Sequence, residues 1–211
     1  MKKTDSNIIS ISIFTIWLFQ ISGALGIVLG MAEWFIPLTP LCLSIFLLLI
    51  YINNRPNNYQ FFIISYSLGA LCELIGVNTG ILFGNYSYGD TLGLKLFNVP
   101  LIMGVNWFII VYISSSIADK IVNTNYLKII LSLLLILFLD ICIEPVAPKM
   151  DMWKFTGYEH APITNYITWA FIALPLIFIY FKQNIKTNFY LSLNIYFSQI
   201  LFFIAINIFF N

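Results

Sequence analysis

Long apolar runs alternate with short polar segments along the whole chain. Seven runs hold few or no charged residues, and each approaches the roughly 20 residues that an α-helix needs to cross a bilayer. They cover residues 8–30, 37–53, 59–77, 96–117, 127–147, 162–181 and 189–210. Because helices satisfy their own backbone hydrogen bonds in lipid, this pattern predicts an all-α, polytopic membrane bundle of about seven transmembrane helices.

The chain shows no internal repeat and no change of composition that would mark a boundary, so we treat residues 1–211 as a single integral membrane domain. Lys2 and Lys3 precede the first run as in a signal peptide, but that run is too long and lacks a cleavage motif, so we expect it to be retained. Ser22, Gly26 and Gly30 recur every four residues in this run. Such spacing predicts a face where another backbone approaches closely.

Composition narrows the class of protein further. Hydrophobic residues make up 60% of the chain and charged residues only 9%, and the mean hydropathy is +0.91. Soluble domains carry roughly 25% charged residues, so a soluble enzyme or a disordered chain is excluded. The formal net charge of +1 leaves no basic surface for nucleic acid. The expected surroundings are the lipid bilayer.

The distribution of lysine and arginine predicts the orientation. Seven helices would place seven positive residues on the side of the N-terminus: Lys2, Lys3, Arg55, Lys120, Lys128, Lys182 and Lys186. The opposite side would hold only Lys95, Lys149 and Lys154. The positive-inside rule then predicts that the N-terminus lies inside, in a multi-pass protein of the cell (inner) membrane.

Three carboxylates lie within the apolar runs: Glu73, Asp140 and Glu144. At a rise of 1.5 Å per residue, Asp140 would lie about 10 Å from the helix end near residue 147, and Glu73 about 6 Å from residue 77. An ionised acid at the bilayer centre costs on the order of 2.5–3.5 kcal/mol, and such residues are usually functional. These acids are therefore the first candidates for a site.

Asp140 and Glu144 are one helical turn apart, so their side chains share a face. Two like charges repel in a medium of low dielectric, and we expect the pair to hold one proton between them. A carboxylic acid beside a carboxylate can act as general acid and base. The structural alternative is a hydrogen-bonded pair that ties this helix to Asn106 or Asn165.

Aromatic residues and glycines gather near the same predicted side of the membrane. The stretch 76–89 contains four glycines together with Tyr86 and Tyr88, so we expect it to re-enter or cap the bundle rather than to form a helix. Neighbouring segments contribute Trp107, Trp153, Tyr158 and Trp169. The alternative for these rings is the aromatic belt of the membrane interface.

Two other membrane classes lack the residues that they need. A retinal protein requires a lysine in its last helix, and residues 189–210 contain none. A metal-dependent oxidase or desaturase requires clustered histidines, whereas the single histidine here, His160, is expected to be solvated. We therefore predict neither a metal nor a cofactor.

Several motifs together resemble one family. The first are Glu73-Leu-Ile-Gly-Val-Asn-Thr-Gly80 and Phe83-Gly-Asn-Tyr-Ser-Tyr88, and the others are Leu38–Leu41, Val99-Pro100, Asn106-Trp107, Asp140 with Glu144-Pro145, Trp153, and Pro162 with Asn165 and Trp169. Over roughly residues 37–181, their order is similar to that of the membrane carotenoid-biosynthesis proteins, which include the carotenoid 1,2-hydratases of bacteria and bisanhydrobacterioruberin hydratase of haloarchaea. Two positions differ from the family pattern: Glu144 stands where many members have Asp, and Asn78 where a basic residue is common.

The resemblance implies cofactor-independent addition of water to the terminal 1,2 double bond of an acyclic carotenoid. Asp140, Glu144 and Glu73 would then be catalytic. Tyr86, Tyr88, Asn106, Trp107, Trp153, Asn165 and Trp169 would bind the substrate. The partners would be the carotenoid and water, with other enzymes of carotenoid biosynthesis as further candidates.

Two alternatives remain open at this point. A proton-initiated carotenoid cyclase shares the first step but lets an internal alkene trap the cation, which a dry pocket would favour. A carotenoid-binding or transport protein would use the buried acids without catalysis.

Overall fold

The computed structural model describes residues 3–53 and 59–210, with side chains from residue 7 onward. Lys2 and Arg55, which were counted for the orientation, lie outside this part, as do the side chains of Lys3 and Asp5. Seven helical segments in the described residues are long and apolar enough to span a membrane. The prediction of an all-α bundle with about seven transmembrane helices is therefore confirmed.

The helices follow the predicted runs closely in most places. Their bounds are α1 (Lys3–Val28), α2 (Ala32–Phe35), the 3₁₀ turn η1 (Ile36–Leu38), α3 (Thr39–Asn53), α4 (Tyr59–Thr79), α5 (Ile102–Ile121), α6 (Asn125–Ile143), α7 (Ile163–Lys182) and α8 (Phe189–Phe210). The segments α2, η1 and α3 follow one another directly and form the second span.

Helices α5 and α6 have different ends from those predicted. Residues 96–101 do not belong to α5, because β2 (Lys95–Leu96) and β3 (Val99–Pro100) pair as a hairpin. Its two turn residues, Phe97 and Asn98, both have positive φ, as a tight hairpin turn requires. Helix α6 ends at Ile143, four residues earlier than expected, so Asp140 lies in its last turn and Glu144 is the residue that follows it.

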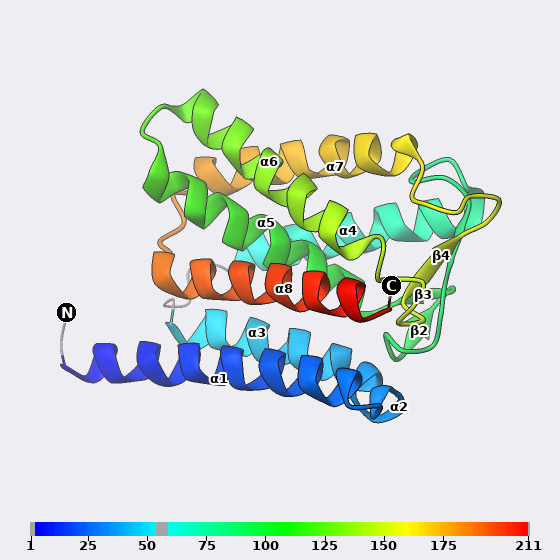
Figure 1. The fold of residues 1–211 in the computed structure, drawn as a ribbon. Coiled ribbons are helices and arrows are strands. Elements are labelled where there is room, and N and C mark those ends of the chain that lie inside the picture. The colour runs from blue at the N-terminus through cyan, green and yellow to red at the C-terminus, as the bar shows by residue number, and fades with distance from the viewer. Residues whose placement is uncertain (1–2, 54–58, 211) are drawn as a thin grey trace.

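Helix α5 forms the centre of the bundle. It contacts α3, α4, α6, α7 and α8, and its residues from Met103 to Ala118 are all buried. A helix that is buried on every side needs apolar or small residues all round, which explains the run of isoleucine, valine and serine in this segment. Figure 1 shows α5 between α6 and α8, with α1 and α3 on the far side of α8.

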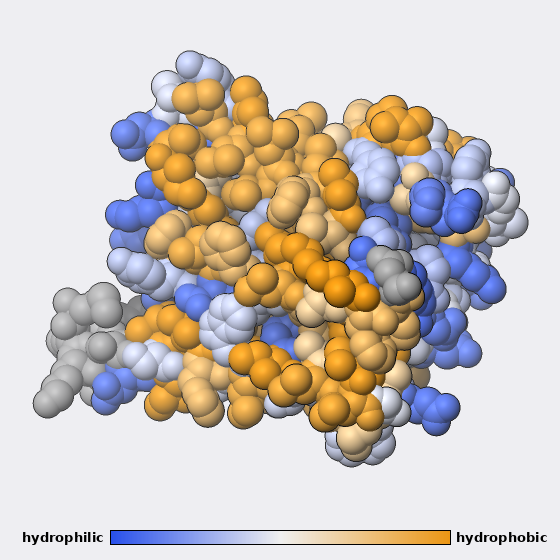
Figure 2. All heavy atoms as spheres, in the orientation of Figure 1, coloured by the Kyte–Doolittle hydropathy of each residue, from blue (hydrophilic) through white to orange (hydrophobic). Residues whose placement is uncertain are grey.

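The strands gather at one end of the bundle, opposite the N-terminus (Figure 1). There β1 (Tyr86–Tyr88) pairs antiparallel with β4 (Trp153–Phe155), which joins the loop after α4 to the loop after α6. Residues 80–89 therefore cap the bundle, as one of the two predicted alternatives stated. Residues 76–79 form the last turn of α4, so the expectation that the whole stretch 76–89 is not helical was wrong there. Figure 2 shows apolar side chains over the helices and hydrophilic side chains at the strand end.

The small-residue face of α1 does not receive a neighbouring backbone. The ring of Phe35, from α2, lies directly over Gly26 and fills the space that a side chain would need. Gly30 lies beyond the end of α1 with a φ of 88°, and no atom lies within 4 Å of the place that a Cβ would take there. The prediction of close backbone packing was wrong at Gly26, where an aromatic side chain uses the space, and at Gly30, where no atom approaches.

Candidate active site

Glu73 lies in the last two turns of α4, and its side chain is buried. Three donors converge on its carboxylate. The hydroxyl groups of Tyr86 and Tyr88 donate to Oε2 over 2.6 and 2.7 Å, and the indole Nε1 of Trp107 donates to Oε1 over 2.9 Å. A carboxylate that only accepts hydrogen bonds suits this set of donors, so the surroundings fit an ionised Glu73.

Two glycines of α4 make room for these donors. Gly69, one turn before Glu73, lies against the indole of Trp107, which any side chain there would overlap. At Gly76, one turn after Glu73, an added Cβ would lie 2.8 Å from the Phe83 ring and 2.9 Å from the Tyr86 hydroxyl oxygen. Residues three and four apart share a helix face, so the order Gly69, Glu73, Gly76 builds a smooth face around one acid.

The two tyrosines reach Glu73 from one strand. Alternate residues of a strand point to the same side, so Tyr86 and Tyr88 of β1 both face the acid while Ser87 faces away. Burial, reinforced by the nearby Glu73, raises the pKa of both tyrosines above the ordinary value. Both hydroxyl groups therefore keep their protons and act as donors.

Asp140 and Glu144 form the second part of the site, and both are buried. The amide nitrogen of Asn165, on α7, donates to Asp140 Oδ2 over 3.2 Å and to Glu144 Oε1 over 2.9 Å. The two acids are also hydrogen-bonded to each other. Asp140 Oδ1 is buried and receives no hydrogen bond from the described donor groups. This arrangement fits one proton shared by the pair.

Glu144 receives a further hydrogen bond from the capping strands. Trp153 Nε1, on β4, donates to Glu144 Oε2 over 3.2 Å. In the register of the sheet, Trp153 is opposite Tyr88, and their rings are in edge contact with centroids 6.2 Å apart. The β1–β4 pair thus delivers two donors to Glu73 and one to Glu144.

Aromatic rings surround the acids. Trp107 and Trp169 stack with ring centroids 4.1 Å apart and planes inclined by 21°. Phe83 lies against Tyr86 and Trp107, and Phe155 against Tyr86. The faces of such rings carry negative potential and attract cations.

A small cavity of about 20 Å³ lies between the two parts of the site. Its polar walls are Glu73, Glu144, Tyr86, Tyr88 and Asn165, and its other walls are Phe83, Met103, Trp153, Phe155 and Trp169. One water molecule needs roughly 10–15 Å³ of such space and two to four polar partners. The cavity therefore has the size and the polar groups for a single water.

The structure brings nine of the ten sequence-predicted site residues together: Glu73, Tyr86, Tyr88, Trp107, Asp140, Glu144, Trp153, Asn165 and Trp169. Asn106 is buried on α5, but in the described part of the chain it has no hydrogen bond to these acids. Consecutive helical positions point about 100° apart, so Trp107 faces Glu73 and Asn106 does not. The structural alternative for Asp140 and Glu144 thus involves Asn165 alone.

Other residues at this end of the bundle were missed or lie outside the site. The sequence-based prediction overlooked Gly69, although glycine one turn from a buried acid was a visible signal. Phe83 begins the motif 83–88 but was not named as a site residue, and Met103 and Phe155 were overlooked because no pattern in the sequence marks them. Tyr158 and His160 are exposed, and no group of three or more His, Cys, Asp or Glu within the described ranges could hold a metal ion.

Asn78, one of the two positions that differ from the family pattern, has a structural contact. Its side-chain nitrogen donates to the carbonyl oxygen of Leu74 over 2.8 Å and to that of Phe97 over 3.2 Å. It thereby ties the end of α4 to the β2–β3 hairpin.

Comparison with known proteins gives one match. The family model described as carotenoid biosynthesis protein matches residues 22–211, which is nearly the whole chain. Neither the curated proteins nor the solved structures yield a match. With a bundle of seven membrane-spanning helices and a buried acid site at one end, the chain belongs to the carotenoid biosynthesis protein family.

Proposed function

We propose that this protein is a carotenoid 1,2-hydratase, which adds water across the terminal double bond of an acyclic carotenoid end group. The family supports a role in carotenoid biosynthesis, and the site supports the reaction. The observation that carries the proposal is the water-sized cavity between Glu73 and Glu144. A dry pocket would favour cyclisation, whereas a place for one water favours hydration.

Asp140 is the general acid in this proposal. Its proton moves to C2 of the double bond as the π electrons form the new C–H bond, which leaves a tertiary cation at C1. Asp140 Oδ1 suits this step because no described donor occupies it. Proton transfer by a positioned side chain contributes typically about 10²–10⁴-fold in rate.

The aromatic walls and Glu73 stabilise the cation. Desolvated rings that line the cavity, such as those of Trp153, Trp169 and Tyr88, contribute about 2 kcal/mol each. Glu73 holds a negative charge beside the cavity, and its three donors fix the position of that charge. Fixed charge in a water-excluded site needs little reorganisation when the cation forms.

Water in the cavity completes the addition. A lone pair of its oxygen forms the C1–O bond, and Glu144 accepts the proton that the water loses. Glu144 and Asp140 are hydrogen-bonded to each other, so the proton returns to Asp140 and the site is restored. The net change is the addition of one water without a change of total oxidation state, which requires no redox cofactor.

The end group is larger than the cavity, so the lining side chains must move apart when it enters. Four walls make no hydrogen bond to an acid among the described residues: Phe83, Met103, Phe155 and Trp169. Their displacement would leave the donors of Glu73 and Glu144 in place.

The test is expression in cells that make lycopene, with water enriched in ¹⁸O. A hydratase gives a product heavier by one water, with the label in its hydroxyl group. An isomer of unchanged mass would instead identify a cyclase. Unchanged pigment, with the protein verified in the membrane, would contradict both enzymes for this substrate and favour the carotenoid-binding alternative. The Asp140→Asn variant serves as the matched inactive control.

The location of the site follows from the proposed orientation. With the N-terminus inside the cell membrane, the strands and the acids lie at the outer side, where water can reach them. Reporter fusions at the two termini test this orientation. A reporter enzyme that is active only on the outer side of the membrane should be active when it is fused to the C-terminus and inactive when it is fused to the N-terminus.

A further inference from the structure

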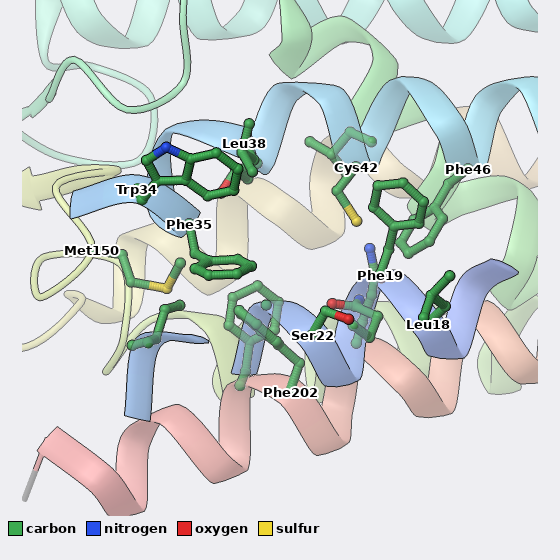
Figure 3. Close-up of a pocket in the computed structure, with 17 residues that line it drawn as sticks. Leu18, Phe19, Ser22, Trp34, Phe35, Leu38, Cys42, Phe46, Met150 and Phe202 are labelled. Atoms are coloured by element: carbon green, nitrogen blue, oxygen red, sulfur yellow. The ribbon is translucent and has the colours of Figure 1, made fainter. Parts of the chain in front are cut away.

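A second, larger cavity lies outside the acid site. It has a volume of about 440 Å³ and lies between α1, α2, α3 and α8. Known small-molecule sites span roughly 300–1,000 Å³, so this cavity has the size of a ligand site. Figure 3 shows Phe19 and Ser22 of α1, Cys42 and Phe46 of α3, and Phe202 of α8 around it.

The walls of this cavity are almost entirely apolar, and many are aromatic. Phe19, Trp34, Phe35, Phe46, Phe202 and Phe203 all line it. Flat aromatic faces pack well against a flat, extended polyene, because both surfaces are polarisable and make many close contacts. The lining therefore suits an elongated unsaturated hydrocarbon.

Four polar side chains interrupt this surface: Gln20, Ser22, Thr39 and Gln199. Gln199, on α8, also lines the cavity, and its side chain is only 4% exposed. Its Oε1 is buried and receives no hydrogen bond from the described residues. A polar group in the membrane region is unfavourable unless it is hydrogen-bonded. A ligand in the cavity could supply the hydrogen bond that this amide oxygen lacks.

A hydroxyl group is the ligand chemistry that fits. The side-chain oxygen and nitrogen of a glutamine can exchange places by rotation, and a hydroxyl both donates and accepts. It can therefore satisfy the amide in either orientation. A plain hydrocarbon or a fatty acyl chain offers no such group at this depth.

The cavity is close to the loop that builds the acid site. Met150 lines the large cavity and Trp153 lines the small one. Three peptide units join them, so their Cα atoms are at most about 11 Å apart. A ligand in the large cavity is thus beside the end of the bundle where the acids lie.

We propose that the cavity between α1, α3 and α8 binds an isoprenoid chain that carries a hydroxyl group, and that this hydroxyl hydrogen-bonds to Gln199. The proposal draws on the membership of the carotenoid biosynthesis family and on the cavity itself. It does not depend on the hydration reaction at the acids, so the two can fail separately.

Binding can be measured with all-trans-retinol and with axerophthene, the same polyene without the hydroxyl. Both probes accept energy from excited tryptophan, and Trp34 lines the cavity. Binding to the purified full chain in micelles should therefore quench the tryptophan emission saturably. The loss of one hydrogen bond corresponds to a roughly three- to tenfold change in affinity. We expect retinol to bind that much more tightly than axerophthene.

Variants separate the hydroxyl contact from the cavity. Gln199→Leu should lower the affinity for retinol by about three- to tenfold and leave the affinity for axerophthene unchanged. Gly23→Leu should abolish saturable binding of both, because a Cβ there has an ordinary 3.4 Å contact with Phe202 and the rest of the side chain fills the cavity. Trp34→Phe should reduce the quenching, because Trp34 lines the cavity.

The control is Ser65→Ala, which removes another buried hydroxyl that has no partner among the described residues and does not line this cavity. It should bind both probes as the unmodified chain does. Equal affinities for retinol and axerophthene in the unmodified chain would overturn the hydroxyl contact. Quenching that persists in Gly23→Leu would overturn the isoprenoid site. Displacement of bound retinol by lysophosphatidylcholine at concentrations similar to that of retinol would also overturn it.

Discussion

The two parts of the acid site differ in how completely their carboxylates are satisfied. Glu73 receives three donors from three different residues, and hydrogen bonds of this kind favour its charged form. Asp140 and Glu144 share one donor, the amide of Asn165, and are hydrogen-bonded to each other. One Asp140 oxygen receives no hydrogen bond from the described residues. A saturated carboxylate holds its charge, whereas an unsaturated pair can gain and lose a proton. Burial alone therefore does not define a catalytic acid.

The largest expected effect comes from the unsaturated pair. Asp140→Asn keeps the size of the side chain and the contact with Asn165 but removes the proton, so we expect product formation to fall by about 10³–10⁴-fold or more. The measurement is the hydroxylated fraction of the pigment, determined by chromatography and mass spectrometry. Equal activity at an equal level of protein in the membrane would remove Asp140 from the mechanism.

Glu144→Gln should have the next largest effect, a loss of about 10²–10³-fold, because the amide cannot accept a proton from water. Glu144→Asp is the matched control, since it restores the carboxylate and corresponds to the residue that many family members are expected to have. Recovery in this variant would show that the proton acceptor matters. If neither variant loses turnover, the pair is structural.

Tyr88→Phe tests the saturated carboxylate. It removes one of three donors without changing the ring packing on Trp153, so we expect a loss of stability of about 1–3 kcal/mol. The proposed reaction should slow by tenfold or less, because Glu73 keeps two donors. The readout is the midpoint of thermal unfolding beside the product yield, and a loss of activity as large as that of Asp140→Asn would give Glu73 and its donors a proton-transfer role.

Gly69→Ala tests the fit of Trp107 against α4. The added methyl group overlaps the indole, and overpacking of this kind costs about 1–3 kcal/mol. Gly104→Ala is the matched control, because its Cβ would lie 2.6 Å from the ring of Tyr66, which does not contact the acids. We expect similar loss of stability in both variants and reduced turnover per folded molecule only in Gly69→Ala.

The smallest effect is expected at the exposed pair of Lys95 and Asp90, whose charged atoms are 2.7 Å apart. The lysine lowers the pKa of Asp90 through a hydrogen bond and its charge, so any stabilisation exists above the ordinary pKa of the carboxyl and is lost as the pH falls. Because water screens exposed charges, Lys95→Ala should leave the unfolding midpoint unchanged at neutral pH. A clear shift would mean that the bond from Lys95 to the carbonyl oxygen of Tyr88 supports the site.

The sequence predicted the helices well and their ends less well. The spans follow from the length of apolar runs, which the bilayer thickness imposes on any helix. The start of α5 was missed because residues 96–101 are mostly apolar and would extend the apolar run whether they form a helix or a hairpin. Only the pairing of β2 with β3 makes them a hairpin. The early end of α6 was missed for a similar reason, since Val146 and Ala147 continue the apolar run and are buried outside a helix.

For the site, one turn of spacing was enough to place Asp140 beside Glu144, because helical geometry is local. Of the two asparagines predicted as possible partners of the acids, Asn165 contacts both, and Asn106 does not because neighbouring helical positions point in different directions. Glycine at positions 69 and 76 could have been used, since its place on the face of Glu73 follows from the same geometry.

The sequence by itself determined that this protein is a membrane bundle with three acids in apolar surroundings, because length, hydropathy and helical periodicity are properties of short segments. Only the tertiary structure decided which donors each acid receives. Tyr86 and Tyr88 reach Glu73, and Trp153 reaches Glu144, because β1 and β4 pair although Tyr86 and Trp153 are 67 positions apart in the chain. That pairing, and the cavity it encloses, depend on long-range packing that no local pattern encodes.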